Sequence, residues 1–117
     1  MPRILVIEDE PVVRDLLCEI LSESYECVAV SSAEEGLARL AQSDFHVVVT
    51  DVKLPGAGGE EFLAAARERA PGLPVIIISG GYGGDARKFL DAGAFGYLLK
   101  PFRFEEVEEM VARAIGK

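Results

Sequence analysis

The sequence predicts one α/β domain of the (βα)₅ type, in which a five-stranded parallel sheet forms the middle layer of a three-layer sandwich. Short apolar runs rich in β-branched residues alternate along the chain with amphipathic segments of helical period. The runs are apolar throughout, which is typical of parallel strands that are buried on both faces and joined by right-handed crossovers. A length of 117 residues, of which 50% are hydrophobic, suits one compact domain.

The expected strands are the continuous apolar runs at residues 4–7, 27–30, 47–49, 75–78 and 97–99. The first helix is expected near residues 11–23, where apolar residues recur at helical spacing and Pro11 suits the first turn. Ser32 is expected to cap a second helix that begins with Ala33. The remaining helices are expected at residues 59–70, 85–92 and 104–115.

Polar side chains stand where the expected strands end. Glu8 and Asp9 follow the first strand, Asp51 follows the third, Ser79 the fourth and Lys100 the fifth. In open parallel sheets, the functional crevice lies beyond the carboxyl ends of the strands, where the strand order reverses. We therefore expect these five side chains to meet at one edge of the sheet.

Three carboxylates at one edge repel one another and raise one another's pKa unless a cation neutralises them. Mg²⁺ prefers a few carboxylates together with water and a substrate phosphate, so it suits this edge. Lys100 and Ser79 add a cation and a hydroxyl that could hold the oxygens of a phosphoryl group in transfer. General acid/base chemistry is less apt, because His46, the single histidine, is expected at the opposite end of its strand.

The pattern resembles the receiver domain of two-component response regulators along the whole chain. The resemblance is carried by the Glu8-Asp9 pair, by Asp51 within the segment DVKLPGAGG, by Ser79-Gly80 and by the segment YLLKPF at 97–102. It implies a flavodoxin-like fold with the strand order 2-1-3-4-5. Each motif alone is a weak signal, but the set in register is specific.

The resemblance implies that Asp51 accepts a phosphoryl group from a phosphohistidine. It implies a Mg²⁺ site, with Mn²⁺ as a possible substitute, in which Asp9 binds the metal directly and Glu8 acts mostly through coordinated water. Asp51 itself and the backbone carbonyl of Lys53 would complete the protein ligands.

The resemblance also assigns the groups around the phosphoryl group. Ser79 would bond to a phosphoryl oxygen, and Lys100 would pair with the phosphoryl group or with Asp51. Pro101 would follow a cis peptide bond with Lys100. Tyr97 would change rotamer when Ser79 moves toward the phosphate, so that the two residues act together as a switch.

These roles imply a phosphorylation-switched signalling domain that catalyses only its own phosphorylation and dephosphorylation. The expected donor is a histidine kinase or a histidine phosphotransfer protein, and the downstream protein or output domain is unknown. A homodimer on phosphorylation is a further possibility. Residues 1–117 are expected to form this single domain, with no output domain in the chain.

Two other functions compete with this interpretation. A pseudo-receiver would be a protein-interaction module that keeps the fold without phosphorylation, and loss of the acidic pair or of Asp51 would favour it. A flavodoxin-like carrier of nucleotide or flavin would need a Ser/Thr/Gly-rich loop after the first strand, where this chain has Glu8-Asp9-Glu10-Pro11.

The composition argues against several classes of function. A net charge of −8 argues against direct binding of nucleic acid, although acidity can also serve solubility alone. The apolar run at residues 4–7 is far shorter than the roughly 7–15 residues of a signal-peptide core, so we expect a cytoplasmic protein that does not enter a membrane. Cys18 and Cys27 lack the spacing of a zinc or redox motif and are expected to be reduced packing residues.

Three further features of the sequence bear on how the phosphorylated state behaves and what it binds. Lys53 places a long cation two residues after Asp51 and is expected to alter the lifetime of the phosphorylated state. The glycine-rich segment 80–84 is expected to be mobile until phosphorylation, because glycine raises the entropic cost of ordering a loop. The glutamates at 105–109 form an acidic face on the last helix that is either simply solvated or binds a partner.

Overall fold

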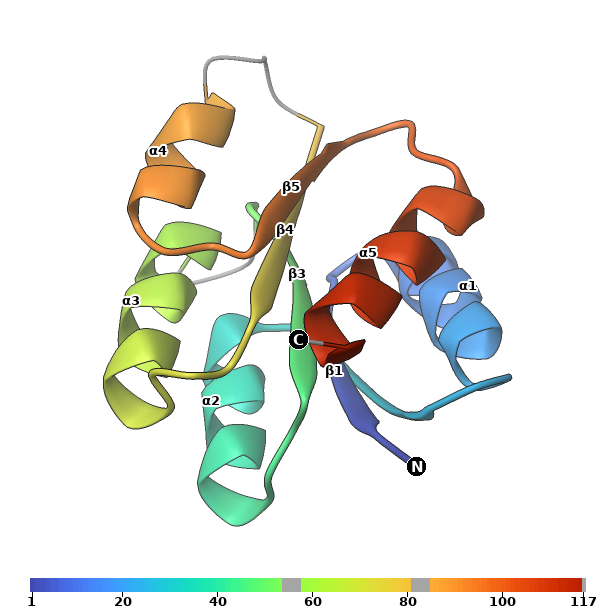
Figure 1. The fold of residues 1–117 in the computed structure, drawn as a ribbon, viewed down its shortest axis with the longest axis horizontal. Coiled ribbons are helices and arrows are strands. Elements are labelled where there is room, and N and C mark those ends of the chain that lie inside the picture. Colours follow the sequence, from blue (N-terminus) through green and yellow to red (C-terminus); the bar gives the residue numbers. More distant parts are fainter. Residues whose placement is uncertain (54–57, 81–84, 117) are drawn as a thin grey trace.

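The computed structural model describes residues 1–53, 58–80 and 85–116, and it contains the expected alternation of strands and helices (Figure 1). The strands are β1 (Arg3–Ile7), β2 (Glu26–Val30), β3 (Val47–Asp51), β4 (Val75–Ser79) and β5 (Gly96–Leu99). The helices are α1 (Pro11–Leu21), α2 (Ala33–Gln42), α3 (Gly59–Arg69), α4 (Asp85–Asp91) and α5 (Phe104–Gly116). All strand pairs are parallel and the order is β2-β1-β3-β4-β5, which confirms the predicted fold.

Successive residues of the strands point to opposite faces of the sheet, and each face has its own core. In β1, Ile4 and Val6 pack with α1 and α5, whereas Leu5 and Ile7 pack with α2, α3 and α4. Figure 1 shows this arrangement, with α1 and α5 together on one side of the sheet. Because both faces are covered, the strands are apolar at nearly every position, as expected of a buried parallel sheet.

β1, β2 and β5 begin one residue before their apolar runs, whereas β3 and β4 extend beyond theirs at the carboxyl end. The sequence placed the end of the third strand at residue 49 and of the fourth at 78, but Asp51 pairs with Ile78 and Ser79 pairs with Leu99 in the sheet. Asp51 and Ser79 are therefore the last residues of their strands. Their backbones are held in the hydrogen-bonded ladder, which apolar periodicity does not detect.

The helix ends follow local hydrogen bonding. The Ser32 hydroxyl accepts the N–H of Glu35 at 3.2 Å, which confirms the predicted cap of α2. Helix α1 ends at Leu21 rather than near residue 23, because the chain turns at Ser22–Ser24 to reach β2. Among the described residues, no helix is both long and apolar enough to cross a membrane.

The two cysteines and the histidine have structural roles in packing and hydrogen bonding. Cys18 and Cys27 are free and half-buried, and burial raises the pKa of the Cys27 thiol, which keeps it in the neutral form. The ring of His46 accepts the backbone N–H of Arg3 through Nδ1 at 3.0 Å. His46 thus ties β1 to the start of β3, at the end of the sheet opposite Asp51.

Candidate functional site

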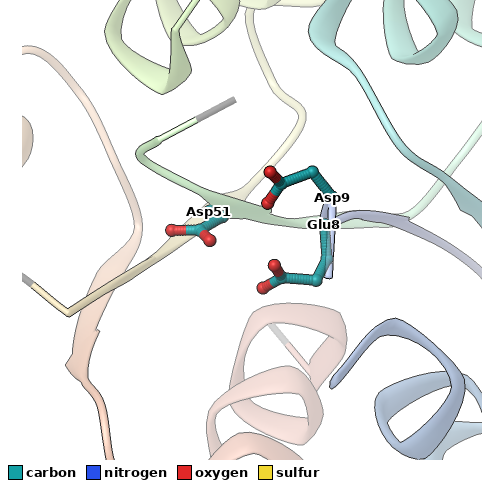
Figure 2. A group of neighbouring side chains, drawn as sticks. All are labelled: Glu8, Asp9 and Asp51. Atoms are coloured by element: carbon teal, nitrogen blue, oxygen red, sulfur yellow. The ribbon is translucent and has the colours of Figure 1, made fainter. Parts of the chain in front are cut away.

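Three carboxylates meet at the carboxyl ends of β1 and β3. Figure 2 shows the Glu8 and Asp9 side chains reaching from the end of β1 toward Asp51. One oxygen from each carboxylate can be chosen so that all three lie within 4.8 Å of one another. Glu8 and Asp51 are buried and Asp9 is exposed. Strand order β2-β1-β3 makes this meeting possible, because it places β1 directly beside β3.

Lys100 is the cation of this cluster. Its Nζ lies 3.0 Å from Asp51 Oδ2 and 3.3 Å from Glu8 Oε1, and it donates a hydrogen bond to each. Glu10 Oε1 is 3.7 Å from the same nitrogen. The backbone N–H of Lys100 donates to the carbonyl of Ser79 at 2.8 Å, which fixes the residue against the end of β4. One ammonium group is therefore shared by three carboxylates.

The pKa of Glu8 is shifted by its surroundings. Burial raises its pKa from the ordinary 4.5 to about 7, and the charge of Asp51 acts in the same direction. The N–H of Glu10, which donates to Glu8 Oε2 at 3.1 Å, and the ammonium of Lys100 lower the pKa in part. The expected effect of a neighbouring carboxylate is present at Glu8, but the loss of hydration is the larger cause.

The pKa of Lys100 reflects the opposite balance. Burial by itself lowers it, but the hydrogen bond and charge of Asp51, together with Glu8, outweigh burial and raise the pKa above its ordinary value. Lys100 therefore stays charged over the physiological range. A permanent cation at this position can bind either a carboxylate or a phosphoryl oxygen.

The backbone around Asp51 is held from two directions. The N–H of Val52 donates to Asp51 Oδ1 at 2.7 Å, and the N–H of Gly59 donates to the carbonyl of Val52 at 2.9 Å. A Cβ atom added to Gly59 would lie 2.7 Å from the carbonyl oxygen of Asp51 and 2.9 Å from Cα of Val52. The first residue of α3 must be glycine for this close approach, which sets the position of the acidic side chain.

A polar cleft of about 430 Å³ opens over the cluster. It is lined by Asp9, Glu10, Asp51, Val52, Lys53, Ser79, Gly80 and Lys100. Ser79 is buried at the floor of the site and Lys53 is exposed at its mouth. The structure thus brings the sequence-predicted acids, the lysine and the serine into one cleft.

Tyr97 lies on β5, two residues before Leu99, and is half-buried. Its ring packs against Phe89 of α4 with 6.0 Å between the ring centroids. Its hydroxyl is buried and has no hydrogen-bond partner among the described residues. The peptide bond between Lys100 and Pro101 is cis.

An apolar groove of about 190 Å³ adjoins the polar cleft. Its walls are Val13 and Leu16 of α1, Phe104 at the start of α5, and the joining residues Lys100, Pro101 and Phe102. Phe104 is 36% exposed and packs edge-to-face on Phe102. The stem of Lys100 forms the boundary between cleft and groove.

Three residues near the site were not identified from the sequence. Glu10 contacts Lys100, Arg14 donates to the backbone carbonyl of Glu8 at 3.1 Å, and Gly59 packs on Asp51. Only Gly59 had a signal, since a glycine at the expected start of a helix calls for a structural reason. The predicted glycine-rich loop lies outside the described residues except for Gly80, which is exposed.

The cluster fits a hard divalent cation. All of its donors are oxygen atoms, they are close enough to share one ion, and the exposed side chain of Asp9 faces the cleft. A cation would also relieve the repulsion between Glu8 and Asp51, which a single lysine does not balance.

The family model of the response regulator receiver domain matches residues 4–112. The chain belongs to this family. Response regulator protein FleR of Pseudomonas aeruginosa is 38% identical over 119 residues, which cover 98% of this chain and 25% of FleR. This receiver domain therefore spans about a quarter of the length of that relative.

Solved structures agree with the family. A response regulator receiver domain protein from Clostridium thermocellum superposes with a TM-score of 0.93 at 30% identity, over 99% of this chain and 95% of that one. Response regulator protein TrrA of Thermotoga maritima, solved in complex with Mg²⁺-BeF, gives 0.88 at 31% identity over 97% and 99%. The receiver domain is thus a signalling domain of the two-component type, in which phosphorylation is the switch.

Proposed function

We propose that this receiver domain accepts a phosphoryl group from a phosphohistidine onto Asp51 and thereby changes its partner-binding surface. The observation that carries the proposal is the position of Asp51, which is buried beside Glu8 and Asp9 and bonded to Lys100 at 3.0 Å. An isolated aspartate at a strand end more commonly caps a turn. Burying two acids beside one lysine costs more free energy than placing one aspartate in a turn. Such a costly arrangement in a cleft is typical of a functional site.

The proposed transfer uses groups of this chain that are already in place. A carboxylate oxygen of Asp51 attacks phosphorus, the bond from phosphorus to the donor's imidazole nitrogen breaks, and the imidazole keeps that electron pair. Lys100 holds the phosphoryl oxygens by charge, and the Ser79 hydroxyl donates a hydrogen bond to one of them. Hydrolysis of phosphorylated Asp51 transfers the phosphoryl group to water and restores the carboxylate, so the domain acts only on its own Asp51.

Asp9, Asp51, Glu8 and the backbone carbonyl of Lys53 would hold Mg²⁺, or Mn²⁺ in its place. The bound ion supplies positive charge that lets an anionic donor approach an acidic cleft. The oxygen-only donor set and its compactness support this assignment.

The proposed switch involves Ser79 and Tyr97. When Ser79 turns toward the phosphoryl group, the side chain of Tyr97 gains or loses space next to Phe89, and the surface of α4 and β5 changes with it. The buried hydroxyl of Tyr97 supports this assignment, because a polar group without a partner among the described residues has little to hold it in one rotamer.

The donor would be a histidine kinase or a histidine phosphotransfer protein, in the cytoplasm. The apolar groove shares Lys100 with the cleft, and this proximity supports a donor that covers the groove when it reaches Asp51. Residues 1–117 would act as a single receiver domain that reports to a separate output protein or domain, with dimerisation on phosphorylation as one route. Direct binding to nucleic acid is not part of the proposal, given the net charge of −8.

The deciding experiment is incubation with acetyl phosphate and Mg²⁺, followed by intact-protein mass spectrometry. We expect the wild type to gain one phosphoryl group that is lost on standing, and Asp51→Asn to gain none. Asp44→Asn, which makes the same change at an exposed position at the other end of the sheet, should behave like the wild type. EDTA should abolish the response. A wild type that neither gains mass nor responds to beryllofluoride would favour the pseudo-receiver instead.

A further inference from the structure

Arg14 connects helix α1 to the acidic pair. It lies in the first turn of α1 and is half-buried, and its Nη1 donates a hydrogen bond to the backbone carbonyl oxygen of Glu8 at 3.1 Å. That carbonyl belongs to the peptide group between Glu8 and Asp9. The two acidic side chains of the cluster therefore branch from the two sides of the one peptide group that Arg14 holds.

The position of this peptide group matters because β1 ends just before it, at Ile7. The N–H of Glu8 still donates to the carbonyl of Val30 at 3.1 Å, but the following residues leave the sheet to enter α1. The exposed side chain of Asp9 takes its direction from the backbone that carries it. A hydrogen bond from α1 to the Glu8 carbonyl fixes that backbone.

We propose that Arg14 is a positioning residue for cation binding: it sets the directions of the Glu8 and Asp9 carboxylates by holding their shared peptide group. The role rests on the proposed cation site but does not depend on phosphoryl transfer. Groups that orient metal ligands from outside commonly change metal affinity by about 10–100-fold when they are removed.

The sign of the effect separates positioning from charge. A positive side chain near a cation site repels the cation, so its removal should strengthen Mg²⁺ binding if charge were its only influence. If Arg14 positions the ligands, its removal should weaken binding despite the lost repulsion. The two roles thus predict opposite changes in the same dissociation constant.

The test is calorimetric titration of Mg²⁺ into the unphosphorylated protein, without any phosphodonor. We expect Arg14→Ala to bind Mg²⁺ about tenfold more weakly than the wild type. Arg14→Lys keeps the charge and one donor group and should recover part of the affinity. Arg113→Ala removes the same charge from an exposed position on α5 and should leave the affinity unchanged.

Thermal unfolding in EDTA establishes whether each variant is folded. If Arg14→Ala is not folded, Arg14→Gln replaces it, because glutamine removes the charge but supplies an amide N–H donor. Equal or tighter Mg²⁺ binding by the folded Arg14 variants would overturn the role of Arg14 while the cation site stands. A wild type that binds no Mg²⁺ would overturn the site itself and this role with it.

Discussion

The two ends of the sheet both carry charged side chains, but they are arranged differently. At the amino end, Arg3 Nε faces one carboxylate, Glu26 Oε2 at 3.4 Å, and the two side chains are 32% and 57% exposed. At the carboxyl end, Lys100 faces Glu8 and Asp51, whose side chains are only 2% and 8% exposed. The first is a one-to-one pair whose glutamate is largely exposed, although Arg3 Nε itself is buried, and the second sets two buried carboxyl groups against one ammonium group.

This difference indicates which end is functional. An ion pair with a largely exposed partner contributes little to stability. Buried carboxylates that outnumber their cations lower the stability of the fold, and such perturbed groups in a cleft are typical of functional sites. Under the proposed function, the carboxyl end retains this cost because the acids there would hold a divalent cation and receive a phosphoryl group.

The largest expected effect concerns pH. The folded state holds the Glu8 proton up to about pH 7, whereas the unfolded chain releases it near 4.5. The folded state therefore binds more protons in this window, and the free energy of unfolding should fall as pH rises through it, by up to roughly 3 kcal/mol. Urea unfolding in EDTA at about pH 5 and about pH 8 measures the difference.

The control for this pH dependence is Glu8→Gln, whose side-chain amide does not titrate. Subtracting its pH dependence from that of the wild type isolates Glu8 from the other acids. Mg²⁺ should remove much of the loss at high pH, because it binds the ionised carboxylate. Identical pH profiles for the two proteins would show that Glu8 is not the strained acid of the site.

The next effect concerns the close approach of α3 to Asp51. Gly59→Ala should destabilise the domain by about 2 kcal/mol, because the new Cβ collides with backbone atoms that cannot move independently. It should also reduce phosphorylation by acetyl phosphate. Gly72→Ala is the control, since it lies toward the amino end of β4 and a Cβ there meets nothing within 4 Å. Equal stabilities of the two variants would contradict the proposed contact.

A smaller effect is expected at the mouth of the cleft. Lys53 is exposed there, and its long side chain can cover the phosphoryl group and attract its charge. Lys53→Asn should speed hydrolysis of phosphorylated Asp51 severalfold, equivalent to about 1 kcal/mol in the barrier. Lys53→Met keeps the length without the charge and separates shielding from attraction. An unchanged lifetime in both variants would remove Lys53 from the mechanism.

The smallest effect is expected at the amino end. Glu26→Gln removes the charge that faces Arg3 from a side chain that is 57% exposed, and it should change the free energy of unfolding by less than about 0.5 kcal/mol. Phosphorylation should be unaffected. A larger loss of stability would mean that the two ends of the sheet differ less than their exposures indicate.

The sequence by itself determined the order of the elements and the identity of the main polar residues. Strands buried on both faces must be apolar at nearly every position, so they are visible as runs, and helices with one buried face are visible by their period. Because parallel strands place their carboxyl ends together, Glu8, Asp9, Asp51, Ser79 and Lys100 could be assigned to one edge before any contact was known.

Only the tertiary structure decided how those residues share their interactions. That Lys100 bonds to both Glu8 and Asp51, that burial more than mutual repulsion raises the pKa of Glu8, and that Arg14 holds the Glu8 carbonyl all depend on distances between distant elements. A sequence pattern records residue type and spacing along one chain. Hydration, strand pairing and side-chain direction are set by neighbours that the folded sheet brings together.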